Sequence, residues 1–119
     1  MILNFSHPLT DEQLKELNVS KEFELTIKTQ LDLQKGFVEQ ISNLLGEIPD
    51  LSQRVNEPFL LVPPALSPAA CVVLAAISAV KGQLPHILRL KPKPDSAIVQ
   101  YQIGEVIDLQ EVYSQFKQI

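Results

Sequence analysis

Short blocks of apolar residues recur along the chain, and their spacing predicts five strands. Residues 2–5 are mostly apolar and run into a Ser-His-Pro turn, as a strand that ends in a turn does. Residues 23–28 alternate apolar and polar side chains, which indicates a strand with one face in water. Residues 59–62 are apolar without interruption, which favours a central parallel strand buried on both faces. Residues 87–90 and 97–109 complete the predicted set.

Capping signals and helical spacing predict two helices in the first half of the chain. Thr10 and Gln13 form a capping box ahead of residues 11–17, because each side chain can bond the backbone amide of the other residue. Apolar residues at helical spacing predict a second helix over residues 37–45. Gly46 follows it and suits the left-handed position that often comes after a helix end.

A third helix is predicted to run to Lys81. Ser67 is expected to be its N-cap, Pro68 its first residue, and Gly82 the residue that ends it. The helix is apolar nearly all round, so we expect other parts of the protein to cover it on more than one side. Cys71 lies within it and is therefore expected to be buried and inert.

The order of these elements predicts the fold. Strands and helices follow one another as β-α-β-α-β-α-β-β, which indicates a mostly parallel sheet with helices on its faces. The connection at residues 93–96 is short, so the last two strands form an antiparallel hairpin. The last strand bends at Gly104, and residues 111–117 form a terminal helix. The whole chain, residues 1–119, is predicted to be a single Rossmann-like α/β domain.

Composition and charge limit the kinds of molecule that the chain is expected to bind and the compartment in which it is expected to occur. The formal net charge is −4, which argues against binding to long nucleic acid but not against a small anion held locally. The start of the chain lacks the features of a signal peptide, and the most apolar stretch, residues 69–80, is too short to span a bilayer. A single cysteine fits a reducing compartment. We therefore expect a cytoplasmic protein with no membrane association.

Ligands in open α/β sheets bind beyond the carboxyl ends of the strands. That rule selects residues 6–10, residues 63–67 and residues 91–93. Two of these segments lead into helix N-termini and the third is basic, so together they predict an anion site. The candidate ligand-binding residues are Ser6, His7, Thr10, Pro64, Ser67, Lys91 and Lys93.

Each candidate also has a structural interpretation. His7 can donate a hydrogen bond to a phosphate or act as a general acid or base, and it can equally pack on Pro8. Ser6, Thr10 and Ser67 are typical turn and cap residues. Lys91 and Lys93 either hold phosphate or only solubilise a proline turn. Walker A, G-x-G-x-x-G and C-x-x-C motifs and histidine clusters are absent, so no metal or cofactor is expected.

Three blocks of sequence resemble a known family. Residues 1–10 (MILNFSHPLT), residues 58–92 and residues 102–110 (QIGEVIDLQ) are similar, in this order, to small Csx-type CRISPR-associated proteins of type III systems. The first block is the most specific, and residues 18–57 match nothing in that family.

The resemblance implies a function in CRISPR signalling. Such proteins are associated with cyclic oligoadenylate, and related ones bind cyclic tetra-adenylate and either open the ring or sequester it. It therefore implies antiviral regulation with cyclic tetra-adenylate as the ligand and His7 as the candidate catalytic residue for ring opening. Because the ligand is symmetric, a homodimer with the ligand at its interface is the expected assembly.

Two other classes of function stay open at this point. One is a protein-interaction module without a nucleotide ligand, which would use the last strand or the third helix. The other is an enzyme that acts on a different phosphorylated small molecule at the same strand ends.

Overall fold

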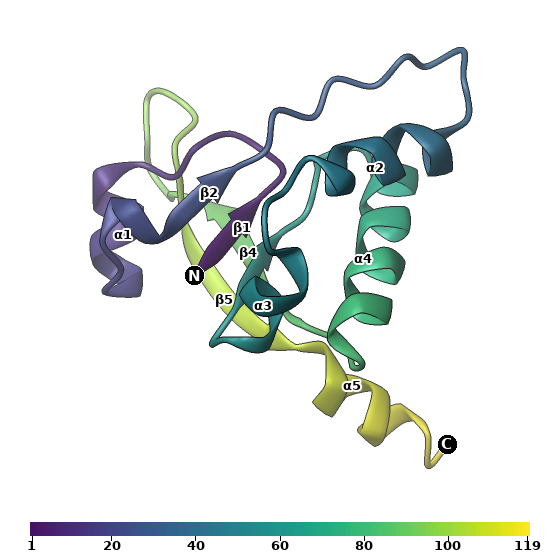
Figure 1. Ribbon diagram of the computed structural model, residues 1–119. Helices are drawn as coiled ribbons and strands as arrows, with labels where there is room; N and C mark the ends of the chain where they lie inside the picture. The colour runs from purple at the N-terminus through teal and green to yellow at the C-terminus, as the bar shows by residue number, and fades with distance from the viewer.

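The strands form one five-stranded sheet in the order β2-β1-β3-β4-β5 in the computed structural model, which describes all residues from 1 to 119 (Figure 1). Strands β1 to β4 are parallel where they pair, and β5 is antiparallel to β4. The mostly parallel sheet with a C-terminal hairpin is thus confirmed. The strand bounds are β1 Ile2–Asn4, β2 Glu24–Thr26, β3 Leu60–Val62, β4 His86–Pro92 and β5 Tyr101–Asp108.

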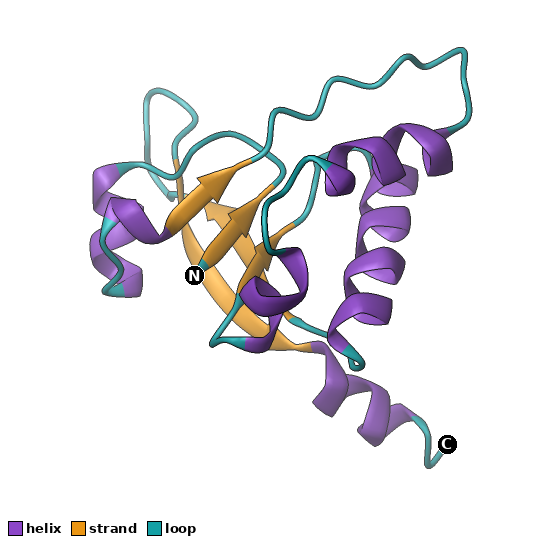
Figure 2. Cartoon of the chain, in the orientation of Figure 1, coloured by secondary structure: helices purple, strands orange, loops and turns teal.

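Helices cover both faces of the sheet. One face carries α1, and the other carries α2, α3 and α4, while α5 extends beyond the sheet (Figures 1 and 2). No helix combines the length and the apolar content that a membrane crossing needs. The helix bounds are α1 Asp11–Leu17, α2 Phe37–Gly46, α3 Leu51–Asn56, α4 Ser67–Lys81 and α5 Leu109–Phe116, with a 3₁₀ turn at Lys21–Phe23.

Two hydrophobic cores explain why β3 is apolar without interruption and why β1 begins with two apolar residues. Leu3 and Leu61 belong to the larger core, under α2, α3 and α4. Ile2 and Val62 belong to the smaller core, together with Leu14 of α1. Successive side chains of a strand point to opposite faces, so β1 and β3 supply both cores.

Several predicted element ends differ from the observed ones. The second strand is shorter than predicted, because Phe23 lies in the 3₁₀ turn and is 51% exposed. Gly46 is the last residue of α2 and has no positive φ, so its predicted left-handed role is wrong. The N-cap of α4 is Leu66, and Ser67 is the first helical residue, because the amide of Ala70 already donates to the Leu66 carbonyl. The capping box at Thr10 is confirmed.

Helix α4 differs most from its prediction. Ala69, Val73 and Ile77 are fully buried at a spacing of four residues. The partly buried side chains that pack against the same core from α4 are Val72, Leu74 and Ala76, so one side of the helix faces the core. Cys71 is two residues, or about 200°, around the helix from Ala69, and it is exposed. The predictions that α4 is covered on more than one side and that Cys71 is buried are therefore wrong.

Gly104 forms a bulge in β5, at the bend that the sequence predicts. Arg89 pairs with Glu105 but Leu90 pairs with Ile103, so Gly104 is the extra residue. A Cβ atom at Gly104 would lie 2.8 Å from the Arg89 carbonyl oxygen. The bulge therefore depends on the absence of a side chain there.

Replacement by alanine should have opposite effects on stability at Gly104 and at Gly46. Gly104→Ala should lower the free energy of unfolding by about 1–3 kcal/mol, because the backbone must shift to admit the methyl group. Gly46→Ala should raise it by about 0.5 kcal/mol, since alanine favours a helix and nothing lies within 4 Å of the added atom. Urea unfolding midpoints check both changes, and shifts of the same sign would contradict the assignment of the bulge.

Candidate functional site

The direction of the chain creates a crevice at one edge of the sheet. Strand β1 lies between β2 and β3 in the sheet. The chain runs from β1 to β2, its neighbour on one side, and then passes back over β1 to β3, its neighbour on the other side. The chain therefore leaves the carboxyl ends of β1 and β3 in opposite directions, toward β2 and toward β4, and a crevice lies between the two loops. Ligands bind at this type of switch point in open α/β sheets.

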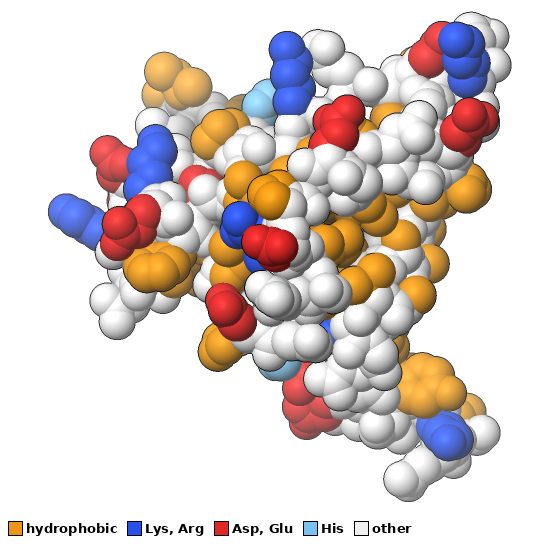
Figure 3. All heavy atoms as spheres, in the orientation of Figure 1, with side chains coloured by type: hydrophobic (Ala, Val, Ile, Leu, Met, Phe, Trp, Pro, Cys, Tyr) orange, Lys and Arg blue, Asp and Glu red, His pale blue; other side chains and the backbone are white.

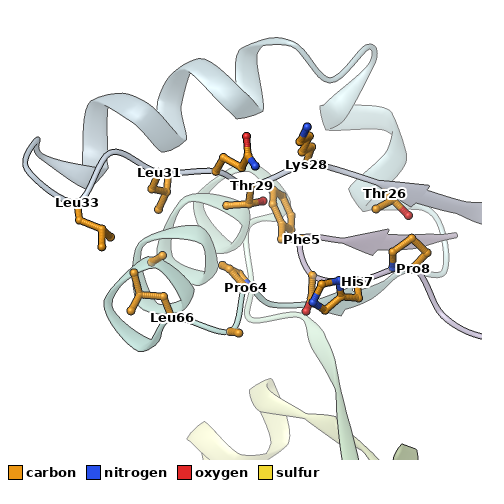
Figure 4. Close-up of a pocket in the computed structure, with 14 residues that line it drawn as sticks. Phe5, His7, Pro8, Thr26, Lys28, Thr29, Leu31, Leu33, Pro64 and Leu66 are labelled. Atoms are coloured by element: carbon orange, nitrogen blue, oxygen red, sulfur yellow. The ribbon is translucent and has the colours of Figure 1, made fainter.

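A pocket of about 650 Å³ lies at this switch point (Figure 4). Its walls come from the loops after β1, β2 and β3 and from the first turn of α4. Figure 4 shows Leu31, Leu33 and Leu66 gathered at one end, and His7, Pro8 and Thr26 toward the other. The full lining is Phe5, Ser6, His7, Pro8, Thr26, Lys28, Thr29, Gln30, Leu31, Leu33, Pro64, Ala65, Leu66 and Ala69.

The charge of the pocket is opposite to that of the chain. Lys28 and His7 are its only ionisable side chains, and no Asp or Glu lines it, although the chain has a net charge of −4. Lys28 is exposed and makes no ion pair. The first turn of α4, whose N-cap supplies no side-chain hydrogen bond, adds the positive end of a helix dipole at the rim. An anion with an apolar portion fits this combination.

A buried asparagine fixes the loop that carries His7. Asn4 is 0% exposed, and its Oδ1 accepts from the Ser6 amide at 2.8 Å. Its Nδ2 donates to the His7 carbonyl at 2.9 Å and to Glu24 Oε2 at 2.8 Å. Glu24 Oε2 also accepts from the Leu9 amide at 2.9 Å. The loop after β1 is thus bonded at three points, and β2 contributes one of the partners.

A second polar side chain shapes the loop after β2. Gln40 of α2 accepts from the Asp32 amide at 2.7 Å through Oε1 and donates to the Asp32 carbonyl at 3.1 Å through Nε2. It also donates to the Gly36 carbonyl at 2.9 Å. This bonding ties the segment next to Leu31 and Leu33, on the pocket wall, to α2.

The structure brings together some of the residues that the sequence singles out. Ser6, His7 and Pro64 line the pocket. Thr10 does not line it and caps α1, and Ser67 lies just outside the lining as the first residue of α4. Residues of the loops after β1 and β3 thus line one pocket, as two of the three predicted segments.

The basic segment after β4 lies elsewhere. Neither Lys91 nor Lys93 lines the pocket. The paired register of β3 and β4 ends at Ile87, and β4 continues to Pro92 as one arm of the hairpin, which takes the lysines past the sheet edge. The Lys93 ammonium lies 3.0 Å from Glu12 Oε1 of α1. The structure therefore does not bring the segment after β4 into the pocket that the other two segments line.

The loop after β2 forms a wall of the pocket that the sequence did not predict. Residues 27–33 follow β2, whose alternating pattern does predict a strand. The same strand-end rule applied there would have selected Lys28. Nothing in the sequence indicates the role of Asn4, because its residue type alone does not show whether an asparagine in a strand is buried and hydrogen-bonded. No group of His, Cys, Asp or Glu in the chain is arranged to hold a metal ion.

Comparisons with family models, with curated proteins and with solved structures give no match to this chain. The fold and the pocket define a Rossmann-like α/β domain with a pocket at its switch point.

Proposed function

We propose that this chain binds cyclic tetra-adenylate in the pocket and lowers its level in the cytoplasm, by sequestration or by ring opening, and so damps the type III CRISPR response. The resemblance of residues 1–10 to small Csx-type proteins supplies the identity of the ligand. The pocket supplies independent support, because its chemistry suits a nucleotide.

One observation carries the proposal. In a chain with a net charge of −4, the pocket at the switch point has a lysine and a histidine and no carboxylate. Lys28 and His7 suit phosphate oxygens, since hydrogen bonds to an ionised acceptor are the strong ones. The leucines at the other end suit the flat faces of a base (Figure 4). A protein-interaction surface has no need of this combination.

Ring opening would require few chemical groups beyond the His7 and Lys28 side chains. The ribose 2′-oxygen attacks the adjacent phosphorus, the bond from phosphorus to the 5′-oxygen breaks, and a 2′,3′-cyclic phosphate and a 5′-hydroxyl result. One proton leaves the 2′-hydroxyl and one reaches the 5′-oxygen. His7 can accept or donate such a proton, and Lys28 can stabilise the charge that develops on the phosphate.

Labelled cyclic tetra-adenylate tests the proposal directly. Gel retardation reports binding, and the appearance of linear product under multiple turnover reports ring opening. Retardation without product identifies a sequestering protein, and product identifies a ring nuclease. The absence of both would overturn the proposed function.

His7→Ala is expected to weaken binding about 10-fold, by loss of a hydrogen bond to a charged group. If the wild type opens the ring, this variant should also lose turnover. His86→Ala is the matched control, because His86 lies at the other end of the sheet, 3.5 Å from Asp108. Equal effects of the two substitutions, measured by titration, would remove His7 from the site.

A protein-interaction module is the second candidate, and exposed aromatic residues favour it. Tyr113 and Phe116 of α5 are 54% and 63% exposed, and β5 is an edge strand. Retention of a partner by the wild type but not by Phe116→Ser, together with no retardation of the nucleotide, would favour this candidate.

A further inference from the structure

A threonine on the pocket wall has a hydroxyl group whose proton is already committed. Thr29 lies in the loop after β2 and lines the pocket, and its Oγ1 is 3.1 Å from the Ile27 carbonyl oxygen. A carbonyl oxygen only accepts hydrogen bonds, so the Thr29 hydroxyl donates its single proton to it. The lone pairs of Oγ1 are left over, and Thr29 therefore offers the pocket an acceptor and no donor.

The other uncharged polar side chains of the pocket are not restricted in this way. Ser6, Thr26 and Gln30 also line it, but no bond to a carbonyl oxygen holds their hydroxyl or amide groups. Such groups turn to donate or to accept, as the ligand requires. Thr29 is therefore the side chain that can distinguish a donor on the ligand from an acceptor.

The loop after β2 places Thr29 beside the apolar end of the pocket. Ile27, Thr29 and Leu31 are half-buried, and the two residues between them, Lys28 and Gln30, are exposed. This alternation is that of an extended chain, in which side chains two residues apart lie on the same side and about 7 Å from each other. Figure 4 shows Thr29 between Leu31 and Lys28 on the wall. A base that packs its face on Leu31 therefore brings one edge to Thr29.

The surroundings make this hydrogen bond selective. The loop is fixed on both sides of Thr29, since the Ile27 amide donates to the Asn4 carbonyl at 2.7 Å and Gln40 bonds Asp32. Helix α4, on the facing wall, has no charged residue before its last, and Figure 3 shows hydrophobic and uncharged side chains along it. In apolar surroundings a polar group without a partner is costly. A mismatch at Thr29 is therefore expected to lower affinity.

We propose that Thr29 determines base specificity, by accepting a hydrogen bond from the exocyclic amine of adenine and excluding a base with a keto oxygen in its place. This inference rests on the proposed function and concerns what the pocket recognises besides phosphate. Adenine N6 is a donor, whereas guanine and hypoxanthine carry the acceptor O6 there. The keto oxygen would face the Thr29 oxygen with no proton between them.

Cyclic tetra-inosinate is the matched probe, because its hypoxanthine bases replace the adenine amine by a keto oxygen while ring size and charge stay the same. The wild type should bind cyclic tetra-adenylate at least about 10-fold more tightly than cyclic tetra-inosinate, since the wrong base leaves polar groups unpaired. Thr29→Val keeps the shape of the side chain without the acceptor. It should bind cyclic tetra-adenylate more weakly and bind the two rings within about two-fold of each other.

Two further variants separate recognition from a structural role of Thr29. Thr29→Ser keeps the hydroxyl and should retain the preference for adenine. Thr26→Val makes the same change toward the His7 end of the pocket and should leave the ratio of the two affinities unchanged within about two-fold. The ratio compares two ligands on one protein, so a general weakening of the pocket cancels from it. Circular dichroism confirms that each variant is folded.

The outcomes separate the inference from the proposed function. Equal binding of the two rings by the wild type, or an undiminished preference in Thr29→Val, would overturn the inference and leave the proposed function standing. Adenosine and inosine monophosphate are the probes if neither ring binds. A preference for the adenosine nucleotide that Thr29→Val loses would then support the inference while the proposed function fails. Binding of none of these ligands would overturn both.

Discussion

Replacing Lys28 by glutamate is expected to weaken the binding of cyclic tetra-adenylate by at least about 100-fold. The substitution removes a charge-assisted hydrogen bond worth about 1.5–3 kcal/mol and adds repulsion between a carboxylate and the phosphates. Lys28 is the only lysine or arginine in the pocket, so no neighbouring cation can replace it. Lys28→Ala, which loses the bond without adding repulsion, should weaken binding about 10-fold. Titration of labelled ligand measures both affinities.

The matched control for Lys28→Glu is Lys21→Glu. Lys21 is exposed, does not line the pocket, and gives the same change in net charge when it is replaced. Its substitution should leave the affinity within about two-fold, because an exposed charge that does not touch the ligand is screened by salt. Equal losses in the two variants would mean that overall charge, and not the pocket, determines binding.

Lys91→Glu distinguishes the pocket from the site that the sequence predicts. If the basic segment after β4 holds the phosphates, this substitution should weaken binding more than Lys28→Glu does. That ranking would move the site to the hairpin and would contradict the assignment to the switch point.

The fold was predictable because its determinants are local. The capping box at Thr10 and the left-handed Gly82 after α4 each depend on a few neighbouring residues, and both are found where the sequence predicts them. The apolar run before Pro63 identifies the central strand for the same reason, since only a strand buried on both faces excludes polar residues.

The site was only partly predictable because it depends on how far each strand extends. The loops after β1 and β3 meet as expected, but β4 continues into the hairpin and takes Lys91 and Lys93 away from the edge. Strand length is set by pairing with β5, which a local pattern does not reveal. For a similar reason the exposure of Cys71 could not be foreseen, because it depends on whether another element packs on α4.

Asn4 has a structural role that the sequence alone does not reveal. It lies on β1 among buried leucine, isoleucine and phenylalanine neighbours, yet it is fully buried itself. Burial of an amide is costly unless its polar atoms are hydrogen-bonded. Both polar atoms of Asn4 are bonded, and all of their partners belong to the His7 loop or to Glu24. The residue therefore stabilises the fold and holds the pocket wall in place.

Asn4→Ala is accordingly expected to lower the free energy of unfolding by about 3 kcal/mol, since it leaves the Ser6 amide and the His7 carbonyl without their partner. Urea unfolding at a fixed m-value measures the loss. Asn43→Ala, at an exposed position of α2, is the control and should change stability by less than about 0.5 kcal/mol.

A double-mutant cycle with Glu24→Ala completes the test of this network. Asn4 and Glu24 share the bond at 2.8 Å, so the double variant should lose about 1 kcal/mol less than the sum of the single losses. The same variants should bind cyclic tetra-adenylate more weakly at concentrations of urea where they are still folded, because the His7 loop is no longer held. Additive losses would mean that the two side chains act separately, and unchanged affinity in folded Asn4→Ala would mean that the position of His7 does not depend on this network.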